Sequence, residues 1–434
     1  MACHHAPNPV PTMKLFLSSA LFFALVVSTL VAGTAHAAER GEKKAGQNSP
    51  ASETDEKALA AAEALYAEAQ YAEAEKAALA LVAARTQALG AEARETLRAR
   101  LLLAEALRMQ SKDAEAEPQL RTLLPVMTKV FGAEDRETLR CQSVLLAFLI
   151  EKDKPGETEK EFRRLIATMT RVLGPEDKIT LLTRLRLAEN LYGVKKYAEA
   201  EAEYQQVLPI YQRTLGVEDR QTLVCEFLLI RALAAQSKHA EVEELCRSLH
   251  PLQIKVLGAE GKQTLYCQTY LIQALSAQNK HAEVEVQCRS LLPLQTKVFG
   301  AESKDTMFCQ DRLLKALSAQ HKHAEVEELC RSVLPLQINV FGAESKETLY
   351  CQDLLFEALL AQNKNAEVEE QCRSVLPLQI KVYGAESKEA LYWQVHLLDA
   401  LMAQHKDAEA EKLCRSLLPL QNHLIQALSA QNKH

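Results

Sequence analysis

Cysteine is the residue type whose chemistry and spacing stand out first in this chain. Among the eleven cysteines, two series recur with a 42-residue period, and each member of the first series precedes a member of the second by half of that period. In an oxidising compartment such pairs could form disulfide bonds, each closing a loop of about 22 residues. Buried free thiols are the alternative, because cysteine is among the most buried residue types. The candidate cysteines are Cys225, Cys246, Cys267, Cys288, Cys309, Cys330, Cys351 and Cys372.

The positions separated by this half period behave like neighbours in a core. Cys141 precedes Phe162 by half a period, and Trp393 precedes Cys414 by the same number of residues. A large apolar residue therefore stands where one cysteine of a pair is missing. In antiparallel helices, the spacing predicts that the two side chains face each other.

No other residue pattern indicates catalysis, a metal or a cofactor. The sequence contains no CxxC pair, P-loop, GxGxxG, HExxH or GxSxG motif. His239, His281 and His323 occur once per period in short polar turns, where solvation is the simplest interpretation. The glutamates of the recurring A-E-V-E-E motif are expected on a solvated outer helix face. We therefore predict that the protein is not an enzyme and takes no cofactor.

Charge excludes one further class of partner. The chain has 51 basic and 57 acidic residues, a formal net charge of −6, and no long basic run. A nucleic-acid surface needs a concentration of positive charge. We predict no nucleic-acid partner.

A 42-residue repeat must supply the elements that position these residues. Glycine and proline both recur with this period, which indicates a repeat architecture. The length of 434 residues then reflects the number of repeats and not the number of globular domains. The periodic glycines are Gly90, Gly132, Gly174, Gly216, Gly258, Gly300, Gly342 and Gly384; the periodic prolines are Pro209, Pro251, Pro293, Pro335, Pro377 and Pro419.

Each repeat is predicted to form a helical hairpin. Residues 263–278 carry one apolar stripe at helical spacing (helix A), and residues 282–299 carry a second (helix B). Gly300 is expected in the left-handed conformation that ends helix B. The proline inside helix B is expected to kink it, or else to separate two shorter helices. The predicted fold is all-α, a right-handed superhelix of about nine hairpins over residues 54–421.

The repeat resembles the tetratricopeptide repeat, and its 42-residue form is similar to the repeats of kinesin light chains. The resemblance rests on L-x-x-x-x-K-x-A-E-x-E in the hairpin and V-F/L-G-x-E after helix B, and it is close over residues 192–216. In the loop this chain has Gly-Ala-Glu-Ser-Lys where that family usually has G-x-x-H-P. The family's asparagine pair on helix A is replaced, for example by Thr269-Tyr270. The resemblance implies a solenoid whose A helices line a concave groove.

The A helices also carry the differences between repeats. Repeats that share long identical sequences in helix B differ in sequence on helix A. Aromatic residues recur on helix A beside residues of both charges. Such a surface suits a peptide or protein partner. Drift after duplication, with the aromatics packed between repeats, is the alternative. The candidate groove residues are Tyr266, Phe308, Tyr350, Tyr392, Arg231, Asp311, Lys315, Asp353, Glu357 and Asp399.

The amino terminus resembles a secretory signal. Lys14, the apolar run 15–31 and Ala35-His36-Ala37 give a basic, an apolar and a cleavage region in order. We predict a signal peptide over residues 1–37, with Met13 as the true start, and a disordered linker over residues 38–53. The protein is then exported to the periplasm or secreted. An uncleaved membrane anchor is the alternative.

The carboxyl end repeats an internal segment. Residues 424–434 match residues 271–281 letter for letter but follow Gln421 after only two residues. We expect this truncated remnant, 422–434, to extend the last helix and to offer a contact for a homo-oligomer; a frayed end is the alternative. The sequence thus favours a non-catalytic scaffold for protein binding, with a self-associating structural component of the cell envelope as the second hypothesis.

Overall fold

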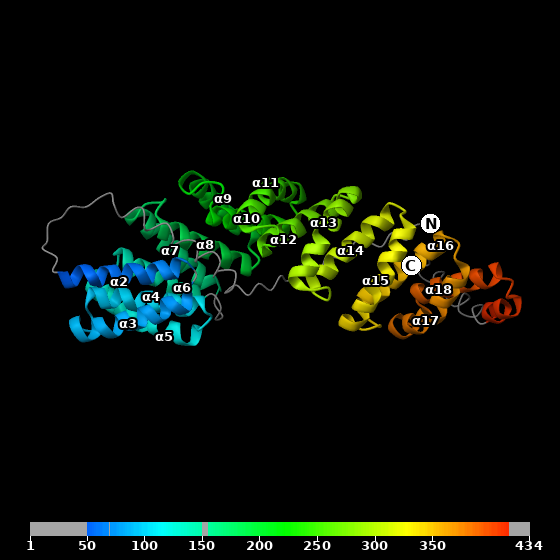
Figure 1. The fold of residues 1–434 in the computed structure, drawn as a ribbon, viewed down its shortest axis with the longest axis horizontal. Helices are drawn as coiled ribbons and strands as arrows, with labels where there is room; N and C mark the ends of the chain where they lie inside the picture. Colours follow the sequence, from blue (N-terminus) through cyan, green and yellow to red (C-terminus); the bar gives the residue numbers. More distant parts are fainter. Residues whose placement is uncertain (1–49, 69, 150–154, 416–434) are drawn as a thin grey trace, which may run out of the picture. The chain divides into compact units, whose positions relative to one another are not determined.

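A computed structural model describes residues 50–68, 70–149 and 155–415, and in these residues the fold is all-α. The helices follow one another as hairpins, in which even-numbered helices are the A helices and odd-numbered helices the B helices (Figure 1). The predicted all-α hairpin solenoid is therefore confirmed. The predicted signal peptide and the remnant at 422–434 lie outside the described residues.

The described residues divide into two compact units, one that ends at Val256 (unit 1) and one that begins at Leu257 (unit 2). The helices that begin in unit 1 are α2 (Pro50–Ala67), α3 (Tyr71–Leu89), α4 (Arg94–Met109), α5 (Asp113–Phe131), α6 (Arg136–Leu149), α7 (Pro155–Val172), α8 (Lys178–Gly193), α9 (Tyr197–Thr214), α10 (Arg220–Ala235) and α11 (His239–Leu257). Unit 2 contains α12 (Lys262–Ala277), α13 (His281–Phe299), α14 (Lys304–Ala319), α15 (His323–Phe341), α16 (Lys346–Ala361), α17 (Asn365–Tyr383) and α18 (Lys388–Ala403). Residues 407–415, which begin the helix after α18, are also helical.

The first helix starts earlier than the predicted solenoid boundary. α2 begins at Pro50, whereas the sequence predicts a linker as far as residue 53. Proline suits the first turn of a helix, because its ring fixes φ at a helical value and its missing N–H has no intrahelical acceptor there. The polarity of these residues alone suggests a linker and does not indicate that the helix begins at Pro50.

Glycine follows each of these B helices because the backbone there adopts a conformation that only glycine reaches without strain. Gly300 follows α13 with φ 93° and ψ 157°, and Gly342 follows α15 with φ 88° and ψ 156°. These angles lie outside the predicted left-handed helical region and in a region that is essentially restricted to glycine. The next A helix then starts with a serine cap, as when Ser303 accepts a hydrogen bond from the Thr306 backbone N–H at 3.2 Å.

The periodic proline does not divide helix B. Pro293 lies inside the continuous helix α13, and Pro335 and Pro377 lie inside α15 and α17 in the same way. The alternative of two shorter helices is therefore wrong. Leu291 and Gln295, on either side of Pro293, are fully buried. The packing of both flanking turns offsets the hydrogen bond that proline cannot make.

In unit 2 the A helices form one layer and the B helices the other. Contacts between successive A helices include the Lys315 ammonium over the Tyr350 ring, which joins α14 to α16. Contacts between successive B helices include the ion pair of Arg331 on α15 with Glu367 on α17. The core lies between the layers, where apolar residues such as Leu275 of α12 and Val284 of α13 are 1% exposed.

Candidate functional site

Tyr266, the first of the predicted groove aromatics, is a packing residue. Its exposed fraction is 8%, and its ring stacks on Phe299 at the end of α13, with 5.7 Å between centroids and 27° between planes. Burial raises the pKa of its hydroxyl to about 12. Tyr266 therefore contributes mainly to the hairpin that contains it.

Phe308 and Tyr350 are half-buried and engaged with cations. The Arg312 guanidinium lies 4.7 Å from the centre of the Phe308 ring, and Lys315 Nζ lies 4.9 Å from that of Tyr350. Lys315 also pairs with Asp311 at 3.0 Å. The contact between Arg312 and Phe308 lies within α14, whereas that between Lys315 and Tyr350 joins α14 to α16. Tyr350 therefore serves packing between repeats as well as any binding surface.

Asp353 is a predicted groove residue, but the structure gives it a supporting position. Its Oδ1 accepts hydrogen bonds from Trp393 Nε1 at 2.9 Å and from Gln379 Nε2 at 3.0 Å. Asp353 thereby connects three helices, α16, α17 and α18. Trp393 also stacks on Phe356, with 4.1 Å between ring centroids. A carboxylate that satisfies two partly buried donors is part of the core network.

The exposed part of the A layer lies on α16 and α18. Tyr392 is 39% exposed, and its ring contacts Phe356 and His396 at centroid distances of 6.0 and 4.6 Å. Val395 is 40% exposed, the Asp399 side chain is 62% exposed, and Glu357 is exposed and has no ion pair within the described residues. We call Glu357, Tyr392, Val395 and Asp399 the A-face patch. It combines an aromatic ring, an aliphatic residue and two carboxylates.

Arg231 belongs to unit 1, whereas the other predicted groove residues belong to unit 2. Its guanidinium is 4.6 Å from the centre of the Tyr192 ring and 3.8 Å from a carboxylate oxygen of Glu189. Each unit therefore presents its own A-layer residues.

The B layer contains a repeated carboxylate network that our interpretation of the A-E-V-E-E motif missed. The second glutamate of this motif is predicted to be solvated, but Glu285, Glu327 and Glu369 are 9%, 5% and 7% exposed. Each accepts from a glutamine and a lysine of the next repeat; Glu369 accepts from Gln404 Nε2 at 2.9 Å and Lys406 Nζ at 2.6 Å. The lysine hydrogen bond lowers the pKa of Glu369.

The sequence does carry a signal for this network once the period is known. A glutamate is followed by glutamine 35 residues later and lysine 37 residues later, as in Glu285, Gln320 and Lys322. The offsets place the donors at the end of the next A helix. The network therefore joins consecutive repeats and does not form a pair of catalytic acids.

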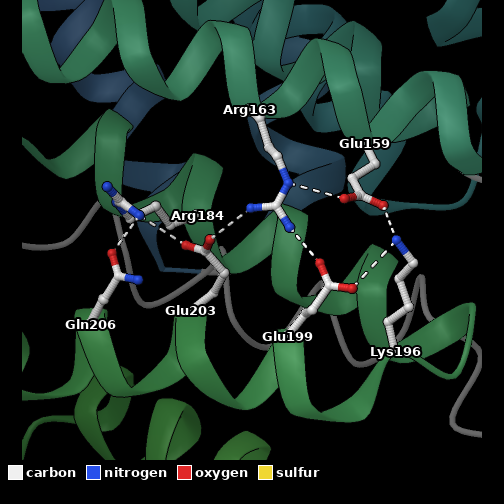
Figure 2. Close-up of polar contacts among 7 residues, drawn as sticks. All are labelled: Glu159, Arg163, Arg184, Lys196, Glu199, Glu203 and Gln206. Atoms are coloured by element: carbon white, nitrogen blue, oxygen red, sulfur yellow. Dashed lines mark hydrogen bonds and ion pairs between the residues drawn. The ribbon is translucent and has the colours of Figure 1, made fainter.

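Unit 1 has a related network of charges (Figure 2). Arg163 of α7 contacts Glu159 of its own helix at 3.0 Å and Glu199 of α9 at 2.7 Å. Lys196, just before α9, contacts Glu159 at 2.8 Å, while Arg184 of α8 contacts Glu203 of α9 at 2.9 Å. In Figure 2 positively and negatively charged side chains alternate, so that each carboxylate contacts a cation. These ion pairs connect consecutive repeats, which indicates a structural role.

The cysteines of the described residues are free thiols, and their neighbours differ from the predicted ones. Cys309 of α14 approaches Cys288 of α13, with Sγ 3.8 Å from the Cys288 carbonyl oxygen. Cys372 faces Trp393, and Cys225 faces Tyr204, at Sγ to carbonyl oxygen distances of 3.6 and 3.9 Å. The second-series cysteine of one repeat therefore meets the first-series position of the next repeat.

The contacts at Cys225, Cys309 and Cys372 join consecutive repeats, whereas the sequence spacing is interpreted as pairing within one hairpin, as for Cys141 with Phe162 and Cys414 with Trp393. The offset between the two cysteine series is half of the 42-residue period. Both registers consequently show the same spacing, and only the packing distinguishes them.

In residues 50–68, 70–149 and 155–415, no cluster of three or more His, Cys, Asp or Glu side chains is arranged to hold a metal ion. Within the same ranges, no helix combines the length and the apolar character needed to cross a membrane.

Comparisons with known proteins agree with this fold. A profile of the tetratricopeptide repeat matches residues 180–221, which include most of α8 and all of α9. No curated protein matches the chain significantly. The match covers one repeat, and the 42-residue period and the hairpin architecture of the described residues are those of a tetratricopeptide-like repeat solenoid.

Several solved structures are similar. The apo form of RapI has a TM-score of 0.55 at 12% identity, with 81% of this chain and 99% of that one covered. A Podosopora anserina putative kinesin light chain with nearly identical TPR-like repeats has a TM-score of 0.37 at 22% identity, covering 46% of this chain and 94% of its own. RapI supports the fold alone at this identity.

Proposed function

We propose that the protein is a non-catalytic scaffold that binds a peptide segment of a protein partner on the A-helix face of unit 2. The fold is of a kind typical of protein-binding scaffolds. The observation that carries the proposal is the A-face patch itself. There the half-exposed Tyr392 and Val395 occur with Glu357, which is exposed, and with Asp399, whose side chain is 62% exposed.

The A-face patch favours a partner of particular chemistry. Tyr392 and Val395 offer apolar area, and Glu357 and Asp399 offer negative charge. An apolar residue flanked by lysine or arginine complements this combination. Aromatic anchors bordered by charges are common at the centres of protein interfaces.

A peptide-display selection on the purified chain tests the proposal without knowledge of the natural partner. We expect the selected peptides to combine apolar and basic residues and to lose at least tenfold in affinity for Tyr392→Ala. Glu370 is exposed on helix α17 of the B layer, so Glu370→Lys serves as the matched surface control. Peptides that bind Tyr392→Ala normally but fail to bind Glu370→Lys would contradict the proposal.

Self-association is the second candidate function, and one observation favours it. Val395 and Met402 of α18 are 40% and 57% exposed, which leaves an apolar strip on the last A helix of the described residues. A second copy could cover this strip and build a structural assembly in the cell envelope. Light scattering after size exclusion would then give a multimer mass for the natural chain and a monomer mass for Met402→Glu. A monomer at all concentrations would exclude this candidate.

Export is proposed from the amino-terminal sequence. A cleaved signal over residues 1–37 would leave a mature chain in the periplasm or outside the cell. Amino-terminal sequencing of the protein from the periplasmic fraction would then begin near Ala38. Recovery of the intact apolar run in the membrane fraction would support the anchor instead.

A further inference from the structure

Two pairs of thiols lie at successive joints between repeats in unit 2. The Cys309 thiol of α14 lies 3.8 Å from the carbonyl oxygen of Cys288 on α13. Cys330 of α15 and Cys351 of α16 occupy the same two positions one 42-residue period later. All four are at most 1% exposed.

A second cysteine is not what this position requires for packing. At the joint between α17 and α18, Trp393 replaces the second cysteine, and the Cys372 thiol donates to the Trp393 carbonyl oxygen as the Cys309 thiol does to that of Cys288. Tyr204 fills the equivalent place opposite Cys225 in unit 1. A large aromatic residue therefore satisfies the same site, and the thiol pairs bring an additional chemical capacity to the two joints.

We propose that Cys288–Cys309 and Cys330–Cys351 are two disulfide-forming sites, each of which fastens helix B of one repeat to helix A of the next. The oxidant is a small-molecule or protein disulfide. One cysteine, as the thiolate, attacks a sulfur of the oxidant and releases one thiol. The second cysteine loses its proton and attacks the mixed disulfide, releasing the other thiol. Two S–H bonds are exchanged for one S–S bond, and the oxidant is reduced to two thiols.

The closed bonds would brace the segment from α13 to α16. Each bond closes a short loop across a joint, which is otherwise held by the glycine turn at Gly300 or Gly342. A cross-link at each joint limits the opening of one repeat from the next, because each repeat of a solenoid contacts only its neighbours. Oxidation would thus control the stiffness of the A layer.

Burial sets the rate of this reaction. Hydrogen bonding to the neighbouring thiol and burial raise the pKa values of Cys309 and Cys330, so little thiolate forms in the closed structure. The oxidant must therefore wait for local opening of a joint. We expect slow oxidation that accelerates in urea concentrations too low to unfold the protein.

Peptide mapping of the oxidised full chain tests the two sites. The protein is treated with oxidised glutathione without denaturant, free thiols are alkylated, and tryptic peptides are analysed by mass spectrometry without reduction. Cys288 lies on the peptide 281–289 and Cys309 on the peptide 305–312. We expect these two peptides to be linked. Linkage of 281–289 to 263–280, which carries Cys267, would show pairing within the hairpin and would overturn the proposal.

The second site needs one precaution. Peptide 323–331, with Cys330, has the same sequence as 239–247, with Cys246, so the mapping is repeated in Cys246→Ser. We expect 323–331 to be linked to 347–364, which carries Cys351. Linkage to 305–312 would again overturn the proposal.

Single substitutions provide the controls. Cys309→Ser should lose the first bond and keep the second, while replacement of the exposed Cys414 by serine should keep both. Full alkylation of Cys288 and Cys309 after the exposed Cys414 has reacted with the oxidant would overturn the proposal. So would bonds that form only at urea concentrations that abolish the helical circular dichroism signal.

Discussion

Replacement of Glu369 by glutamine should weaken unit 2 without changing its shape. The Glu369 carboxylate accepts from Gln404 Nε2 at 2.9 Å, Lys406 Nζ at 2.6 Å and Arg373 Nε at 3.0 Å. Glutamine has the same volume but no charge, and its amide group presents N–H donors to a site built from donors. One joint between repeats therefore loses its anion.

The expected cost follows from the exposure of the three partners. The Lys406 and Arg373 side chains are 41% and 51% exposed, so water screens each ion pair to about 0.5 kcal/mol. The hydrogen bond from Gln404 to the buried charged group is worth about 1.5 kcal/mol. Together we expect a loss of about 2.5 kcal/mol, which corresponds to a shift of about 1 M in the urea midpoint of unit 2.

The chain provides its own reporter and its own control for this measurement. Trp393 is the one tryptophan in the sequence, it is 1% exposed, and it lies on α18, whose end supplies Gln404. Its fluorescence in urea should report the earlier unfolding of Glu369→Gln. Glu370, the next residue, is exposed, and Glu370→Gln makes the same change in charge. Equal midpoints for the two variants would refute a structural role for the carboxylate network.

Three further outcomes are expected. Asp353→Ala should lower stability by about 2 kcal/mol, because Trp393 Nε1 and Gln379 Nε2 lose their acceptor; an unchanged urea midpoint by circular dichroism would contradict this. Gly342→Ala should cost about 1–3 kcal/mol, because its φ of 88° with ψ 156° is closed to alanine, and a melting temperature equal to that of the natural chain would count against it. The hydrogen bond from Lys406 lowers the folded-state pKa of Glu369 below the ordinary 4.5, so the stabilising contribution of Glu369 is full above that value and is lost as the pH falls through the lowered pKa. The urea midpoint should therefore fall as the pH drops below about 4.5, and less so in Glu369→Gln; an equal fall in both proteins would argue against this source.

The hairpins could be predicted because one residue marks each boundary. Gly300 and Gly342 repeat at the period of the chain, and the turn they form is closed to other residues. The apolar stripes between them then define helices by spacing alone. The sequence did not show that Pro293 would stay inside one helix, because this outcome depends on the burial of Leu291 and Gln295 against other helices.

The candidate site could be predicted only in part, because spacing does not identify partners. Asp353 and Glu357 lie on the same A helix. The Asp353 carboxylate accepts a hydrogen bond from Trp393, whereas Glu357 is exposed to solvent. The cysteine spacing did not identify the contacts between consecutive repeats, because half of the period fits two arrangements equally well. The network at Glu369 needed the packing of α17 against the end of α18, although its offsets are visible in the sequence.

A charge-exchange cycle on the A-face patch tests the central claim most directly. Glu357 is exposed and has no ion pair in the part of the chain that the structure describes, so Glu357→Lys reverses the charge of the surface without loss of such a contact. For a basic peptide selected on the natural chain, we predict weaker binding to Glu357→Lys, and recovery when a lysine of the peptide is replaced by glutamate. Affinities measured by calorimetry that are unaffected by either exchange would contradict binding on the A-helix face.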